Sequence, residues 1–161
     1  MKKVNFNNQI SKNFTLKELT YSDTAKKLGL ENIPNETEYN NMCYLVNNLL
    51  QPLREELCKP IIINYCYRGE QLNEAVNGSK TSQHCKGQAA DIEIKGMSNY
   101  DLACHIRDNY TFDQLILEYA NNLINDKNSG WVHVSLKENE NRKQCLTIKS
   151  AKSGYLPGLI K

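Results

Sequence analysis

The sequence lacks several features, and each absence excludes a class of protein. None of its apolar runs approaches the roughly 20 residues of a membrane-spanning helix, so no membrane span is expected. The formal net charge is only +2 at pH 7, which is too small to indicate nucleic acid as a partner. The chain contains no C-x-x-C pair, no low-complexity tract and no internal repeat. We therefore expect one ordinary domain over residues 1–161.

We also expect no secretory signal in the N-terminal segment. Lys2 and Lys3 supply positive charge, but no apolar stretch follows them. We therefore expect the protein to be made in the cytoplasm, where its six cysteines would stay reduced.

Helix signals dominate the first part of the chain and strand signals the second. Capping-box spacings at Thr15, Asn35 and Ser98 predict three helix starts. Apolar residues recur in steps of three and four over 36–58, which predicts one long helix that ends before Pro60. Strands are expected over residues 60–67 (a buried strand), 88–94, 112–119 and 131–136. This order favours an α+β fold, with N-terminal helices packed on a small antiparallel or mixed sheet.

The core of this domain is expected to span about residues 13–136. Residues 137–161 are basic and polar and include Gly154, Pro157 and Gly158. A partly ordered tail is the expectation for this segment, and binding of wall polymers is the alternative.

Histidine is scarce, and two of the three histidines lie in distinctive segments. His84 and Asp91 occur in SQHCKGQAAD, and His133 occurs in GWVHVS. Gly87 would let the loop that carries His84 turn into the strand that carries Asp91. Two imidazoles and one carboxylate are the ligands of catalytic zinc sites that keep a fourth position open for water. A lone histidine in a strand is more often structural than a metal ligand, so the interpretation depends on the residues around these histidines.

Those surrounding residues resemble the zinc peptidases of the peptidase M15 family, near the D-alanyl-D-alanine carboxypeptidases and L-alanyl-D-glutamate endolysins. The similarity runs from Phe14 to about Leu136. Its motifs are Phe14-Thr-Leu-Lys-Glu-Leu19, Leu53-Arg54, Tyr67-Arg68, Gly78-Ser79, Ser82-Gln-His-Cys-Lys-Gly-Gln-Ala-Ala-Asp91 and Trp131-Val-His-Val-Ser135. The resemblance implies a hedgehog/DD-peptidase-like fold, zinc on His84, Asp91 and His133, and cleavage of peptides in bacterial peptidoglycan.

Hydrolysis also needs a group that takes a proton from water and passes it to the leaving amine. Some family members carry an acid three positions before the final histidine, where this chain has Gly130. We predict that Glu118 is the catalytic base, because a carboxylate at the end of the apolar run LILEY is otherwise out of place. The alternatives are a solvent-exposed strand end for Glu118, and Asp113 or Glu93 as the base.

Other residues near these motifs are candidates for binding substrate. Arg68 ends the first predicted strand, and its fixed donors suit a developing oxyanion or a substrate carboxylate. A surface arginine is the alternative. Ser82 and Gln83 could orient His84 or contact the peptide, or simply form a turn. Trp131 is expected beside the site.

Two functions compete on this sequence. The first is a zinc peptidase that cuts peptidoglycan stem peptides, as a carboxypeptidase or as an endopeptidase. It would act on the wall after release during phage lysis, or as a virion component. The second is a module that keeps the metal but has lost catalysis, which the missing acid at Gly130 leaves open; a metal-free adhesive domain has little support.

Overall fold

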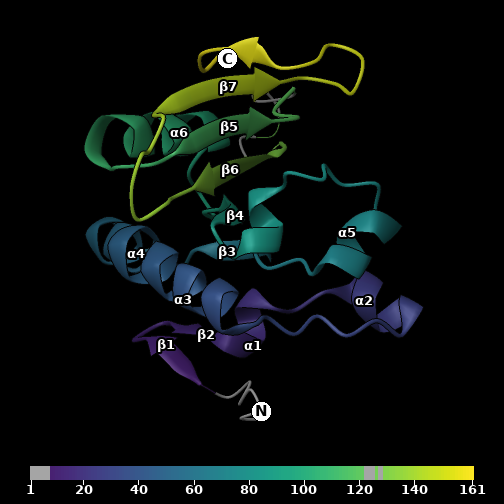
Figure 1. The fold of residues 1–161 in the computed structure, drawn as a ribbon. Helices are drawn as coiled ribbons and strands as arrows, with labels where there is room; N and C mark the ends of the chain where they lie inside the picture. The colour runs from purple at the N-terminus through teal and green to yellow at the C-terminus, as the bar shows by residue number, and fades with distance from the viewer. Residues whose placement is uncertain (1–7, 122–125, 127–128) are drawn as a thin grey trace.

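The computed structural model describes residues 8–121, 126 and 129–161, and it has the expected α+β fold (Figure 1). The helical elements are α1 (Leu16–Leu19), α2 (Asp23–Leu28), α3 (Glu36–Leu45), η1 (Val46–Leu50), α4 (Gln51–Leu57), α5 (Glu70–Ala75), η2 (Gln83–Lys86) and α6 (Asn99–Asn109). The strands are β1 (Gln9–Ser11), β2 (Phe14–Thr15), β3 (Ile62–Tyr65), β4 (Ala89–Glu93), β5 (Gln114–Glu118), β6 (Trp131–Ser135), β7 (Gln144–Ile148) and β8 (Leu156–Pro157). No helix in these ranges is long and apolar enough to cross a membrane.

The long helix predicted over residues 36–58 is present as α3, η1 and α4 in direct succession. Asn35 and Glu38 form the predicted capping box at its start. The middle segment, η1, is a π-helix, which sequence periodicity did not reveal. Cys58 adopts the left-handed conformation with φ of 50° and ends the helix before Pro60. The apolar stripe of this helix is fully buried; it consists of Met42, Leu45, Val46, Leu49, Leu50 and Leu53.

The larger sheet is mixed and has the strand order β3-β4-β6-β5-β7-β8. Its neighbouring strands are antiparallel except for β5 and β7, which are parallel. The expectation of a buried strand over residues 60–67 was wrong for most of its length. Strand β3 pairs only with β4 and forms an edge of the sheet, so Ile62 is 46% exposed.

The segment 137–161 is not a loose tail but supplies strands β7 and β8. Gln114 to Glu118 of β5 pair in register with Gln144 to Ile148 of β7. The Thr147 hydroxyl donates to the Gly158 carbonyl and accepts from the Ile160 amide, which fixes the C-terminal residues against β7. The sheet and its core therefore continue beyond residue 136.

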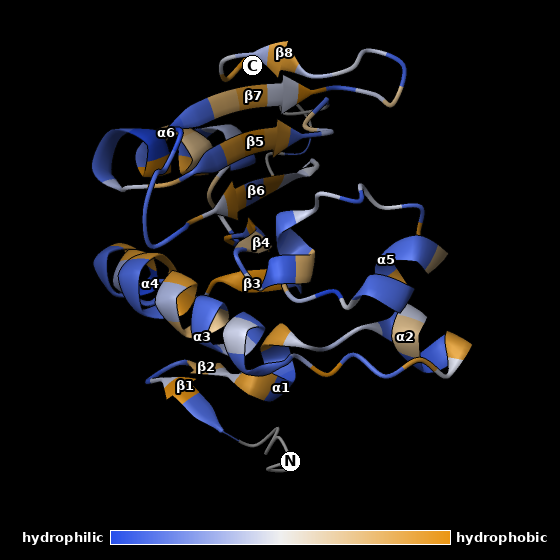
Figure 2. Cartoon of the chain, viewed as in Figure 1, coloured by the Kyte–Doolittle hydropathy of each residue, from blue (hydrophilic) through white to orange (hydrophobic). Residues whose placement is uncertain are grey.

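The two faces of the central strands have different chemistry. One face is apolar and fully buried, and its residues include Ala90, Ile92, Leu115, Leu117, Val132 and Val134. Helix α6 packs on β5 and β6, and Figure 2 shows these strands mostly in the colour of apolar residues. Because side chains alternate along a strand, Asp91, Glu118 and His133 all point to the opposite face. The core thus anchors the strands that carry the polar residues.

The loop between His84 and Asp91 turns at Gly87, as the sequence suggested. Gly87 follows η2 with φ of +68°, in the left-handed region. A Cβ added there would lie 2.3 Å from the Glu38 carbonyl oxygen and 3.0 Å from the Met42 Cγ. Only glycine fits between η2, β4 and α3 at this point.

Replacing Gly87 with alanine is expected to lower the free energy of unfolding by more than about 3 kcal/mol, because backbone contact adds to left-handed strain. Gly29→Ala is the matched control, since Gly29 has φ of +65° but nothing within 4 Å of an added Cβ. That control should lose only about 1 kcal/mol. Denaturant unfolding of both variants measures the difference, and equal losses would contradict the steric explanation.

Candidate metal centre and substrate cleft

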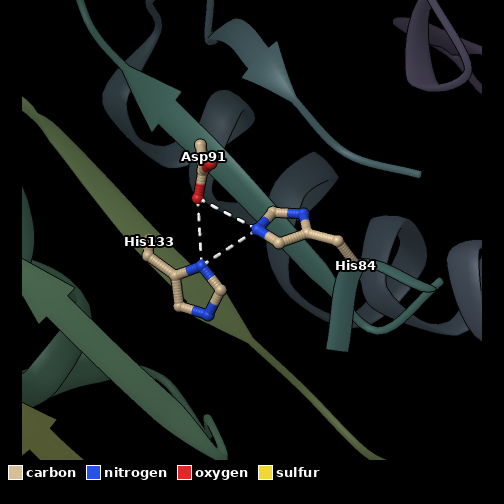
Figure 3. A group of neighbouring side chains, drawn as sticks. All are labelled: His84, Asp91 and His133. Carbon is tan, nitrogen blue, oxygen red and sulfur yellow. Dashed lines mark hydrogen bonds and ion pairs between the residues drawn. The ribbon is translucent and has the colours of Figure 1, made fainter. Parts of the chain in front are cut away.

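Strand register brings together the three residues predicted as metal ligands. Asp91 of β4 lies directly opposite His133 of β6, and His133 lies opposite Ile116 of β5. His84 reaches the same place from η2, just before β4. Figure 3 shows the three side chains pointing toward one another.

The ligand atoms lie close together in a largely buried position. The distance between His133 Nδ1 and Asp91 Oδ1 is 3.0 Å, and that between His84 Nε2 and Asp91 Oδ1 is 3.3 Å. His84 Nε2 and His133 Nδ1 are 3.2 Å apart. His84 is 5% exposed and His133 is 7% exposed.

A hydrogen bond on the far side of the His84 ring orients it. Its Nδ1 lies 2.7 Å from the carbonyl oxygen of Cys66, which can only accept, so Nδ1 carries the proton. In the neutral ring, Nε2 then presents a lone pair to the Asp91 carboxylate. Two acceptors that face each other at this distance require a positive charge between them or on the imidazole.

This arrangement fits a zinc ion. Four tetrahedral ligands at about 2.1 Å from zinc lie roughly 3.4 Å from one another, close to the separations found here. The outer hydrogen bond from His84 to a backbone carbonyl is also what metal-bound histidines commonly make. The donor set of two imidazoles and one carboxylate therefore matches the metal in chemistry and in spacing.

Burial and mutual charge shift the pKa values of the three groups. Burial raises the pKa of Asp91, but His84 and His133 outweigh it and hold this pKa well below its usual range. Burial lowers the pKa of His84, whereas the Asp91 charge raises it, with a net increase. Burial dominates at His133 and lowers its pKa. Asp91 therefore remains an ionised carboxylate, as a metal ligand must.

Glu118 lies in the same cleft as the three residues, at the end of β5 and opposite Trp131. Burial, followed by the negative charge of Asp91, raises its pKa to about 7, although His84, the Trp131 indole and Arg68 oppose this shift. The Trp131 Nε1 is near Glu118 but does not reach the geometry of a full hydrogen bond. A carboxyl group with this pKa can both accept and release a proton near neutral pH.

The structure also explains why residue 130 is a glycine. Gly130 has φ of +72°, and an added Cβ would lie 2.0 Å from the Glu118 carbonyl oxygen. Its neighbour across the turn, Tyr119, is left-handed as well, with φ of 56°. The backbone that ends β5 fills the space a side chain at residue 130 would need.

The two alternative bases lie in other surroundings. The Asp113 carboxylate is buried and bonded to Arg142 and Lys137; burial raises its pKa, but these cations outweigh the effect and lower it to about 2. Glu93 accepts a hydrogen bond from Asn64 and does not line the cleft.

The cleft has a volume of about 500 Å³ and contains every site residue that the sequence predicted. Its lining consists of Arg68, Ser79, Thr81, Ser82, Gln83, His84, Asp91, Gln114, Ile116, Glu118, Trp131, His133, Arg142, Leu146 and Tyr155. Arg142, Leu146 and Tyr155 were missed because they belong to the segment expected as a tail. The apolar residues Cys145, Leu146 and Ile148 were the available signal for a strand in this segment.

Arg68 lines this cleft, and not all of its N–H groups have hydrogen-bond partners among the described residues. Its Nη2 donates to the Ser82 Oγ over 3.3 Å, and its Cζ lies 5.3 Å from the centre of the Tyr65 ring. Its Nε is buried, with no hydrogen-bond partner among the described residues. Gln83 instead donates to the Asp113 carboxylate over 3.0 Å.

Comparison with models of known protein families identifies a match over most of the chain. A family model described as Peptidase M15 matches residues 12–135, which include the three candidate ligands, Glu118 and Arg68. No curated protein matches the chain. The matched region ends before β7 and β8, so the cleft residues from these strands and their loops lie outside it.

The pKa of Glu118 yields a stability prediction for the metal-free protein. This pKa is raised from an ordinary 4.5 to about 7, so stability falls as pH rises through this interval. Glu118→Gln is expected to raise the free energy of unfolding by about 2 kcal/mol at pH 8 and to change it little at pH 4.5. Denaturant unfolding with a chelator present measures this. Glu31→Gln, at an exposed position, is the matched control; the same result for both variants would contradict burial of Glu118.

Proposed function

Because the chain belongs to the peptidase M15 family, we propose that it is a zinc-dependent peptidase that hydrolyses the stem peptides of bacterial peptidoglycan. It would act as a carboxypeptidase or as an endopeptidase of the endolysin kind. The observation that carries the proposal is the convergence of His84, Asp91 and His133 in a cleft that also contains Glu118. The family match supports the class of reaction, and these residues would bind the metal and transfer the proton.

The metal would be held by His84 Nε2, Asp91 Oδ1 and His133 Nδ1. When bound, zinc would supply a Lewis acid that polarises a carbonyl group and lowers the pKa of water. The hydrogen bond from His84 to Cys66 and the rigid pairing of β4 with β6 keep the ligand atoms in place.

Glu118 would act as the general base and then as the general acid. Its carboxylate would accept a proton from the attacking water and deliver this proton to the amine that leaves. Burial and the nearby Asp91 charge support this role, because they bring its pKa close to neutrality. The position on β5, two residues beyond the partner of His133, supports it as well.

Arg68 would stabilise negative charge on the substrate. The part of the guanidinium that is not bonded to Ser82 would donate to an oxyanion or to a peptide carboxylate. Ser82 would hold Arg68 in place, while Trp131 would form the wall next to Glu118. Gln83, tied to Asp113, would line the opposite end of the cleft.

The alternative of a metal-binding module without catalysis rested on the missing acid at Gly130. Glu118 provides a carboxylate with a suitable pKa in the same cleft. We therefore favour the peptidase over the inactive module.

Metal analysis tests the first half of this proposal. The wild-type chain is expected to bind one zinc ion, and His84→Ala is expected to lose it. Zinc at a hundredfold excess over its Kd should stabilise the stripped wild-type protein by about 3 kcal/mol, because the ion binds only the folded site. His105→Ala is the matched control, since the half-buried His105 of α6 pairs with Glu56 of α4, outside the cleft. Stoichiometric zinc on His84→Ala would contradict the ligand assignment.

Hydrolysis of purified peptidoglycan tests the second half, with products identified by mass spectrometry before and after zinc is removed and restored. Glu118→Gln should keep zinc but lose activity about 10²- to 10⁴-fold. In the wild type, kcat/KM should fall as pH drops, with a midpoint at or below about 7, because only the ionised carboxylate accepts a proton. Glu93→Gln should retain both the wild-type rate and the fall of kcat/KM at low pH. No zinc-dependent product at all would refute the proposed function.

A further inference from the structure

A buried ionic group joins the C-terminal segment to one end of the cleft. The Asp113 side chain is only 1% exposed and accepts hydrogen bonds from the backbone and guanidinium of Arg142. Lys137 Nζ lies 3.2 Å from the same carboxylate, and Gln83 Nε2 lies 3.0 Å from it. Arg142 Nη2 also donates to Gln83 Oε1, so the arginine is held from two sides.

This group lies at the end of the cleft opposite Glu118. Asp113 immediately precedes Gln114, the first residue of β5, and Glu118 is the last. His133 pairs with Ile116, midway between them. At about 3.3 Å per residue, Gln114 is roughly 7 Å from the metal centre along the strand, about two residues of an extended peptide. Gln83 and Arg142 both line the cleft there.

The group as a whole carries an excess of positive charge, and one of its cations lines the cleft. One carboxylate, kept ionised by a pKa lowered to about 2, faces two cations. Lys137 does not line the cleft, whereas Arg142 does, and its side chain is 50% exposed. Arg142 uses Nε and Nη2 for Asp113 and Gln83, so Nη1 is left without a partner among the described residues. A guanidinium fixed along one edge and free at the other can bind a second carboxylate.

We propose that Arg142, held in place by Asp113 and Gln83, is a specificity-determining residue that binds a free carboxylate of the substrate one or two residues from the scissile bond. This inference rests on the proposed function, because it concerns substrate choice in the same cleft. It assigns to this chain a substrate contact outside the region that the family model matches. The preferred substrates are then acidic peptides, and amidation of the bound carboxylate weakens their binding.

The test uses synthetic stem peptides in which each free carboxylate is replaced, one at a time, by a carboxamide. Affinity is measured by calorimetry on the full zinc-loaded chain with Glu118→Gln, which keeps the peptides intact, and kcat/KM is measured on the chain with Glu118. Arg142→Gln is compared with Lys137→Gln. Both changes remove one cation from Asp113, but only the first alters the cleft.

With Arg142 present, one carboxylate is expected to bind about tenfold better than its carboxamide. Arg142→Gln should abolish that preference without weakening the carboxamide peptide, whereas Lys137→Gln should keep it. Arg142→Lys guards against misfolding, because lysine still pairs with Asp113 but has no second edge to offer. It should lose most of the preference.

The inference is overturned if no carboxylate is preferred, if both glutamine variants lose the preference equally, or if Arg142→Lys retains it. Failure of the proposed function gives a different result. In that case no peptide is hydrolysed by the zinc-loaded chain, while the binding preference and its loss in Arg142→Gln persist. Hydrolysis without any carboxylate preference leaves the peptidase in place and removes only the role of Arg142.

Discussion

The site depends above all on the pairing register of β4 with β6, which sets Asp91 opposite His133. A slip of one residue would turn one of these side chains into the core, since alternate residues on a strand face opposite sides. Ala90 and Val132, which are fully buried on the other face, make such a slip costly. The packing of the apolar face therefore fixes the positions of the polar residues, and the geometry of the candidate metal centre depends on the side of the sheet that faces the core.

The polar face, by contrast, buries a second carboxylate near the Asp91 charge. The His84 Nε2 atom and the Asp91 carboxylate face each other, and the negative charge of Asp91 raises the pKa of Glu118. The ionised form of Glu118 therefore reduces stability, and it persists because the surrounding fold determines its position. At the other end of the cleft Asp113 is satisfied by two cations, so the two carboxylates at the ends of β5 have opposite environments and opposite pKa shifts.

Much of this could be predicted from sequence, where the signal is local. The helix starts at Asn35 and Ser98 follow from caps within three residues, and Glu118 was found as a charge inside an apolar strand. The convergence of the ligands required the family resemblance, because nothing local says that β4 and β6 are neighbours. The π-helical η1 and the edge position of β3 depend on tertiary packing. Strands β7 and β8 were missed for the same reason: polar flanks hide a short apolar pattern whose partner, β5, lies some 30 residues earlier.

The parallel pairing of β7 with β5 has a consequence for the nascent chain. Strand β5 pairs with β6 on one side only until residues 144–148 have been made. A chain that stops after the matched region at residue 135 would therefore have an unpaired edge at β5. This strand carries apolar residues, such as Leu115 and Leu117, that are fully buried in the complete fold. Open edges of this kind recruit strands from other molecules. Premature termination should thus produce self-association rather than a smaller soluble protein. The last strands therefore protect the edge of β5 as well as lining the cleft.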